Sequence, residues 1–158
     1  MYIHVVLSQN VRPPASPSVP VLPCACANLR RATRAVTRFY DRELREAGIE
    51  PTQYSLLMAL HIKGEITQGA LGALLALDST TLTRVLKPLI ARGWITERPG
   101  QDRRQRLLQL TGAGRRKYDQ AEGHWSRAQD KLKASMGEPD WSEMGTLLAR
   151  VTQISTRD

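Results

Sequence analysis

The chain has 158 residues, 41% of them hydrophobic, which suits one compact domain, or one domain with a tail. No apolar run approaches the length of a membrane span, so we expect no membrane partner. Lysine and arginine total 23 against 15 acidic residues, and the resulting net charge of +8 favours a polyanionic partner. Without a signal-peptide pattern, and with only two cysteines, the chain is expected to be cytoplasmic.

The first 23 residues differ in composition from the rest. They hold five of the nine prolines and a single charged residue, Arg12. Such a stretch is typical of an extended segment that packs little. We therefore predict a weakly ordered N-terminal arm over residues 1–23.

From Cys24 onward, apolar residues recur at steps of three and four, the period of a helix. Gly48 is expected to end the first helix, because glycine readily takes the left-handed conformation that closes helices. Pro51 suits the first turn of a second helix, where no backbone N–H bond is needed, and Gly64 ends it.

The next stretch predicts a short extended piece over 66–67 and a short helix over 68–75. A tight turn at 76–77 follows. Asp78 or Ser79 can then cap a helix that runs to about residue 92.

After Gly93 the period of the apolar residues changes from about 3.6 to about 2, which indicates strands. The spacing predicts a hairpin with strands over 94–98 and 106–110, followed by a long helix over 112–136. A last helix is expected after Pro139. The predicted fold class is mainly α with a small β-hairpin.

Most of the net charge lies in one helix and the hairpin behind it. Residues 79–106 hold seven basic against two acidic residues, or +5. Residues 48–78 carry −2 and residues 112–158 carry +1. The simplest interpretation of such a run is a solvated basic surface, and the alternative is a nucleic-acid interface.

Two short helices around a tight turn, the second of them basic, predict a helix-turn-helix, and the hairpin adds a wing. A helix fits the major groove of DNA with its first turns against the bases, and a cationic wing tip suits the narrow minor groove. The candidate DNA-binding residues are Ser79, Thr80, Thr81, Thr83, Arg84, Lys87, Arg98, Arg103, Arg104 and Arg106.

Residues 71–114 resemble the MarR family of winged helix-turn-helix regulators. The stretches 78–84, 86–89 and 92–95 are similar to its recognition helix, and 102–114 to its wing and the start of its fifth helix. The spacing from Asp-Arg-Arg to Leu-Thr-x-x-Gly is the most specific part. The resemblance implies a homodimer, with residues 24–47 and 112–158 as a helical dimerisation region and 48–111 as the DNA-binding lobe. It also implies that each lobe reads half of a palindromic operator, most commonly to repress.

The resemblance also implies individual roles. Thr80, Thr81, Thr83, Arg84 and Lys87 would contact the major groove and its phosphates. Arg104 would enter the minor groove. Asp102 would hold an arginine of the wing through a charged hydrogen bond, and the simpler alternative is an ordinary turn residue.

Three positions depart from a regular helix-turn-helix pattern. Ala76 stands where the family often has glycine, so we expect the turn to avoid a left-handed residue. Gly72 should weaken the helix that contains it slightly. Pro88 removes one helical hydrogen bond, but the family often has proline here, so one helix with a mild kink is expected.

The family commonly binds small aromatic acids or their thioesters between the dimerisation region and the lobe. The candidate ligand-binding residues are Arg34, Arg38, Tyr54 and His61, whose simpler interpretation is packing or surface pairing. Trp125 and Trp141 are expected in the dimer core rather than in a ligand site.

Cys24 and Cys26 stand two apart at the start of the first helix. Three interpretations stay open: small buried side chains, a thiol redox site that could reach the partner subunit, and a soft-metal site. No histidine stands at a metal-ligand spacing, and no Ser-His-Asp set or pair of carboxylates appears, so we expect neither a metal, a cofactor nor an enzyme.

The sequence therefore predicts a dimeric, sequence-specific DNA-binding regulator, a repressor relieved by a small molecule. Two alternatives remain: a repressor that responds to oxidation of Cys24 and Cys26, and a winged-helix module that docks protein and no longer binds DNA.

Overall fold

A computed structural model describes residues 19–102 and 105–156 of the chain. The elements follow in the predicted order, and most bounds agree to within about one residue. They are α1 (Ala25–Leu44), the short 3₁₀ turn η1 (Arg45–Ala47), α2 (Pro51–Lys63), β1 (Ile66–Thr67), α3 (Gln68–Leu75), α4 (Ser79–Ala91), β2 (Ile95–Pro99), β3 (Arg106–Leu110), α5 (Gly112–Met136) and α6 (Glu138–Ser155). The prediction of a mainly helical fold with a small β wing is confirmed.

Side-chain caps fix where the helices start. The side chains of Cys24, Thr67, Asp78 and Thr111 each accept a backbone N–H bond from the residue three positions on. Each cap satisfies an amide that the helix itself leaves unbonded. An oxygen cap such as Thr67 or Thr111 stabilises the start of its helix by about 1 kcal/mol, and the Cys24 sulfur is a weaker acceptor. These local signals explain why the helix starts could be located from the sequence.

The wing is wider than the predicted hairpin, because β1 joins it. The sheet is antiparallel with the order β1-β3-β2, so β3 lies in the centre. Ile66 pairs with Leu108, and Ile95 pairs with Leu110. The short extended piece before α3 therefore attaches the helix-turn-helix to the base of the wing.

The hydrophobic core fills the space between α2, α4, the sheet and the first half of α5. Its fully buried side chains include Leu57, Leu71, Leu82, Leu89 and Leu108. Pro88 lies inside α4, which continues to Ala91 as one helix, as predicted.

The turn between α3 and α4 corrects one expectation. Ala76 takes the left-handed conformation (φ 50°), which the sequence had been expected to avoid. This conformation lets the N–H of Leu77 bond to the carbonyl of Gly72 at 2.9 Å, which closes the end of α3. Gly72 has a packing role as well, since a Cβ there would lie 3.1 Å from the Leu77 carbonyl oxygen.

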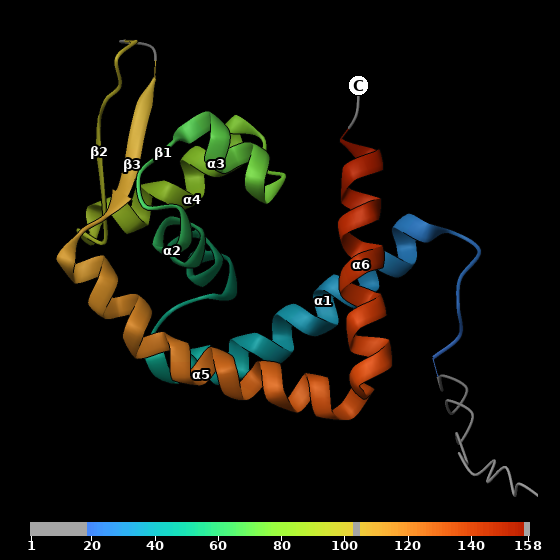
Figure 1. Ribbon diagram of the computed structural model, residues 1–158. Helices are drawn as coiled ribbons and strands as arrows, with labels where there is room; N and C mark the ends of the chain where they lie inside the picture. Colours follow the sequence, from blue (N-terminus) through green and yellow to red (C-terminus); the bar gives the residue numbers. More distant parts are fainter. Residues whose placement is uncertain (1–18, 103–104, 157–158) are drawn as a thin grey trace, which may run out of the picture.

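The long helices lie outside this lobe. Figure 1 shows α1 and α5 running side by side along the base of the molecule, with α6 rising from the end of α5 past α1. None of the described residues of α6 is buried, and Leu147, Leu148 and Ile154 are exposed.

The described part of the arm, residues 19–23, is fixed to α1. The Asn28 amide bonds to both the N–H and the carbonyl of Leu22 at 3.0 and 2.8 Å, and Arg31 donates to the Pro20 carbonyl at 2.8 Å. The rest of the predicted arm, residues 1–18, lies outside the described residues. Within the described ranges, no helix is both long enough and apolar enough to cross a membrane.

Candidate nucleic-acid interface

One side of α4 is buried and the other faces solvent. Leu82, Leu86 and Leu89 pack into the core. The opposite side exposes polar and basic residues of the predicted interface, namely Ser79, Thr80, Thr83, Arg84 and Lys87. The helix therefore presents the predicted side chains as one surface.

Asp78 fixes the start of this surface. Its carboxylate accepts the Thr81 N–H at 2.8 Å and the Thr81 hydroxyl at 2.6 Å. These hydrogen bonds, the one from the Thr81 hydroxyl first, lower the pKa of Asp78 below its usual value. Asp78 therefore stays ionised and caps α4 at neutral pH.

Two of the predicted threonine contacts are already engaged within the protein. The Thr81 hydroxyl donates to Asp78, and the Thr83 hydroxyl donates to the Ser79 carbonyl oxygen at 2.8 Å. The Thr83 oxygen also accepts the side-chain amide of Gln68 at 3.1 Å. The hydroxyl hydrogens of Thr81 and Thr83, which we expected to contact DNA, are therefore used in hydrogen bonds within the protein.

The wing carries two of its arginines in ion pairs. Arg98 makes a bidentate pair with Glu65, at 2.7 and 2.6 Å. Arg106 donates to Glu97 at 2.8 Å, across β2 and β3. Both pairs remain solvent-exposed, so their main effect is to orient the guanidinium groups, and they add little stability.

The wing tip is only partly described. Asp102 accepts the N–H of Gln105 on its carbonyl oxygen at 2.8 Å, and Gly100 donates to the Gln105 carbonyl at 2.8 Å. Arg103 and Arg104 lie outside the described residues. The predicted bridge from Asp102 to a wing arginine therefore stays a prediction, as does the minor-groove role of Arg104.

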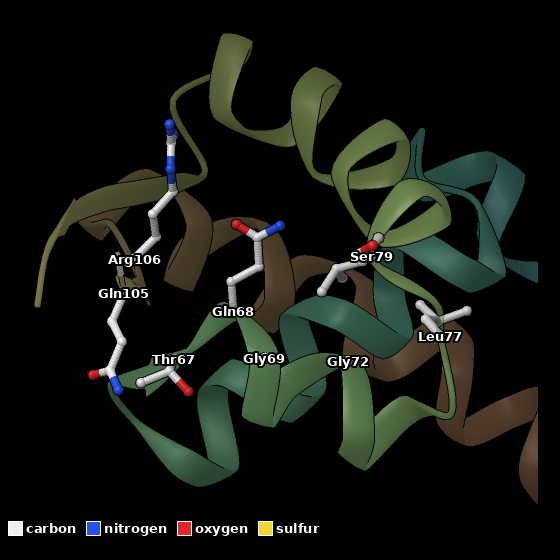
Figure 2. A pocket seen from close by; sticks show the side chains of 9 residues that line it. Thr67, Gln68, Gly69, Gly72, Leu77, Ser79, Gln105 and Arg106 are labelled. Atoms are coloured by element: carbon white, nitrogen blue, oxygen red, sulfur yellow. The ribbon is translucent and has the colours of Figure 1, made fainter. Parts of the chain in front are cut away.

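An open hollow of about 550 Å³ lies between the helix-turn-helix and the wing. Figure 2 shows Gln68 at its centre, between Arg106 of the wing and Ser79 of α4. A second hollow of about 430 Å³ adjoins Gln68 on the side of Lys87. No local pattern in the sequence pointed to Gln68, because its position depends on how α3 packs against α4.

The start of α5 is attached directly to the end of the recognition helix. The Thr111 hydroxyl donates to the Gly93 carbonyl at 2.6 Å and accepts the Gly114 N–H at 3.0 Å. A Cβ on Gly114 would lie 1.9 Å from the Trp94 carbonyl oxygen. The Thr-x-x-Gly spacing therefore has a physical cause: a cap, and a contact too close for any side chain.

The four predicted ligand-binding residues fall into separate places. Tyr54 and His61 of α2 meet Tyr118 of α5, with ring centroids 5.5 and 4.3 Å from that of Tyr118. Arg34 and Arg38 are exposed on α1, and Arg34 lines a groove between α1 and α6. One chain therefore does not bring the arginines and the rings together.

The ring cluster contains one unusual polar group. Tyr54 is 1% exposed, and its hydroxyl has no hydrogen-bond partner among the described residues. Burial raises the pKa of this hydroxyl far above its usual value, so it remains protonated. Trp125, 5.8 Å from the Tyr54 ring, belongs to this intramolecular stack and is partly buried without a partner subunit.

The two cysteines are free thiols, and both are exposed, so within one chain neither is the small buried side chain that the sequence allowed. Cys24 caps α1 and accepts the Ala27 N–H on its sulfur at 3.4 Å. Cys26 lines the same α1–α6 groove as Arg34. Among the described residues, no group of histidine, cysteine and acidic side chains is placed to hold a metal ion.

A basic recognition helix beside a wing, on a lobe joined to long flanking helices, defines a winged helix-turn-helix DNA-binding protein. The MarR family model matches residues 47–105. The DNA-bound crystal structure of the M. tuberculosis transcriptional regulator MosR is 33% identical, with a TM-score of 0.77, and covers 84% of this chain and 96% of its own. The Bacillus subtilis HTH-type transcriptional regulator YwoH is 27% identical over 71% of this chain and 82% of its own length.

The structure of the PcaV regulator from Streptomyces coelicolor, solved with its natural ligand, shares the fold at 23% identity and a TM-score of 0.77. It covers 89% of this chain and 99% of its own. The chain belongs to the MarR family of DNA-binding transcriptional regulators, and it is not an enzyme.

Proposed function

We propose that the protein is a cytoplasmic, homodimeric repressor that binds a palindromic DNA operator, with α4 in the major groove and the wing in the adjacent minor groove. The observation that carries the proposal is the exposed, polar and basic side of α4 beside an arginine-bearing wing. The DNA-bound crystal structure of MosR, at 33% identity, supports it.

A titration of duplex DNA against salt tests DNA binding. Contacts to phosphates release counterions, so affinity should fall steeply and linearly on logarithmic axes as salt rises. Random duplex should show this loss, and DNA upstream of the protein's own gene should bind more tightly than random duplex. Salt-independent or absent binding would instead favour the alternative of a winged-helix module that docks protein.

The homodimer is supported by apolar surface that the single chain leaves uncovered. Leu29 and Val36 of α1 are more than a third exposed, and Leu147, Leu148 and Ile154 of α6 are exposed even further. Monomeric proteins rarely expose so many large apolar side chains in one region. Light scattering at micromolar protein should give twice 17.7 kDa, and a mass of 17.7 kDa would contradict the homodimer.

Relief by a small aromatic acid or its thioester is supported by the cluster of Tyr54, His61 and Tyr118, since a buried hydroxyl without a partner can donate to a carboxylate. The ligand-bound structure of PcaV adds a precedent within the fold. In a homodimer, an exposed arginine of α1 from the partner subunit could supply a positive charge to pair with the carboxylate of such a ligand.

Tyr54→Phe tests this site without disturbing the packing. The variant removes an unpaired buried hydroxyl, so the ligand-free protein should melt at the same or a higher temperature. Salicylate, as the probe, should release DNA from the wild type and release less from the variant. Equal release from both proteins would exclude the Tyr54 hydroxyl from the site.

Oxidation of Cys24 and Cys26 remains the second candidate signal, because Cys24 caps α1 through its sulfur and both thiols are exposed. Diamide should then weaken DNA binding by the wild type and leave the double variant Cys24→Ser and Cys26→Ser unchanged. Serine preserves the cap, so a difference would report thiol chemistry. Equal loss in both proteins would exclude the thiols as the switch.

A further inference from the structure

Gln68 lies at the first position of α3, outside the recognition helix, yet it is bonded to that helix. Its side-chain amide donates to the Thr83 hydroxyl at 3.1 Å, and that hydroxyl in turn donates to the Ser79 carbonyl at 2.8 Å. The Thr83 hydroxyl, itself held by the Ser79 carbonyl, therefore sets the direction in which the Gln68 amide points. Among the described residues, no acceptor bonds to the second N–H of the same amide nitrogen, so this N–H can donate to a ligand.

The surroundings of Gln68 favour an anionic acceptor. Lys87 and Arg106 line the hollow beside Gln68, together with Glu97. The Glu97 carboxylate is paired with Arg106 at 2.8 Å, so the three side chains together carry a net charge of +1. Figure 2 shows the Gln68 side chain extending into the space beside Arg106.

The proposed course of DNA over the lobe identifies the anion as a backbone phosphate. A major groove and its neighbouring minor groove are separated by one sugar-phosphate strand. If α4 enters the one and the wing tip the other, that strand must pass between them. The space between them is lined by Gln68, Ser79 and Arg106.

We propose that Gln68 is a DNA-contacting residue that donates a hydrogen bond to a backbone phosphate between the two grooves, with Thr83 as its positioning residue. The inference rests on the proposed placement of α4 and the wing. It assigns the Thr83 hydroxyl to the orientation of Gln68 and not to the bases. Because phosphate contacts set register and carry no sequence information, Gln68 would hold the lobe in place on any duplex.

The test compares Gln68→Ala, Thr83→Val and the double variant on two duplexes, one selected from a random pool and one of random sequence. Gln68→Ala should weaken binding to both duplexes by a similar factor, about tenfold per half-site, as for one hydrogen bond to a charged group. Thr83→Val should weaken both in the same direction, and the double variant should bind no more weakly than Gln68→Ala alone. Gln109→Ala is the matched control, because Gln109 is exposed on the opposite face of β3 from Arg106.

Two further measurements separate a phosphate contact from other roles. The salt dependence should keep its slope in Gln68→Ala, because a neutral amide displaces no counterion, whereas Lys87→Ala should lower the slope by about 1. A neutral methylphosphonate, placed at one backbone position at a time, should weaken wild-type binding at the contacted position and leave Gln68→Ala insensitive there. Circular dichroism would verify that each variant is folded.

The outcomes are distinct. A wild type that binds no duplex would overturn the proposed function, and this inference with it. A wild type that binds duplex DNA while Gln68→Ala binds equally well would overturn this inference alone. A loss confined to the selected duplex would also overturn it, because it would indicate a base contact. If Thr83→Val weakened binding by the same factor in the Gln68→Ala background as in the wild type, Thr83 would contact DNA itself.

Discussion

Gly114→Ala should be far more destabilising than a glycine-to-alanine change at the start of a helix normally is. The new Cβ would lie 1.9 Å from the Trp94 carbonyl oxygen and 2.8 Å from its carbon. Both neighbours are backbone atoms, and the same oxygen accepts the Thr111 N–H at 3.0 Å. The chain would have to separate by more than 1 Å at a junction of several hydrogen bonds. Overpacking of this kind costs about 3 kcal/mol or more, which would lower Tm by roughly 10 °C.

Gly112→Ala is the matched control, because it lies in the same turn behind the same Thr111 cap. A Cβ there would meet only the tip of the flexible Arg116 side chain, at 3.6 Å. Its stability should change by less than about 0.5 kcal/mol. Urea unfolding of both variants at one fixed protein concentration measures the difference. Equal stability of Gly114→Ala and Gly112→Ala would refute the close contact with Trp94.

Three further results are expected. Ala76→Gly should stabilise the protein by about 0.5–1 kcal/mol in urea unfolding, because relief of the left-handed strain exceeds the entropy that glycine adds to the unfolded chain; a loss of stability would contradict this. Folding lowers the pKa of Asp78, so the ionised carboxylate stabilises the folded protein at neutral pH, and this stabilisation is lost as the pH falls through the unfolded pKa near 4 and below. The Tm of the wild type should therefore fall more steeply in this pH range than the Tm of Asp78→Asn. Parallel curves of Tm against pH for the two proteins would be evidence against the cap. Arg104→Ala should weaken DNA binding by about 1–3 kcal/mol in an anisotropy titration without changing the oligomeric state, and unchanged affinity would exclude a minor-groove contact.

The sequence located most elements because their ends carry local signals. The bounds of α3, β3 and α5 match the prediction, and Thr111 and Gly112 mark the start of α5 without any knowledge of the tertiary structure. The exposed face of α4 could also be predicted, because leucines at helical spacing mark the buried face and the opposite face must then be exposed to solvent.

The contacts within the site could not be predicted in the same way. Gln68 and Thr83 are 15 residues apart, and Glu65 and Arg98 are 33 apart, so each pair depends on how α3, α4 and the wing pack together. Residue type indicated that Thr83 and Arg98 could bind DNA, but it could not show that their polar groups have partners within the protein.

At Ala76, the preference of a single residue type led to a wrong expectation about the backbone conformation. Glycine is the usual residue in the left-handed conformation, so alanine argued against that conformation. The hydrogen bond from Leu77 to Gly72 and the close packing of Gly72 on the Leu77 carbonyl hold Ala76 there at a modest cost. The backbone contacts of the turn therefore outweighed the preference of the single residue, whereas at Gly72 and Gly114 the glycine is explained by the carbonyl oxygen that lies next to it.

The junction around Trp94 connects the recognition helix to the long helices. Arg92 and Lys117 each lie about 5 Å from the centre of the Trp94 ring. Arg92 also donates to Gln53 of α2 at 3.4 Å, and Lys117 donates to the Ala47 carbonyl between α1 and α2. Together with the close approach of Gly114, these contacts fix the first turns of α5 to the end of α4 and to the base of α2. In the proposed homodimer, a change in how the two copies pack through their long helices would therefore move each recognition helix together with its lobe. The distance between the two recognition helices would then decide whether both can occupy the proposed half-sites one helical turn apart.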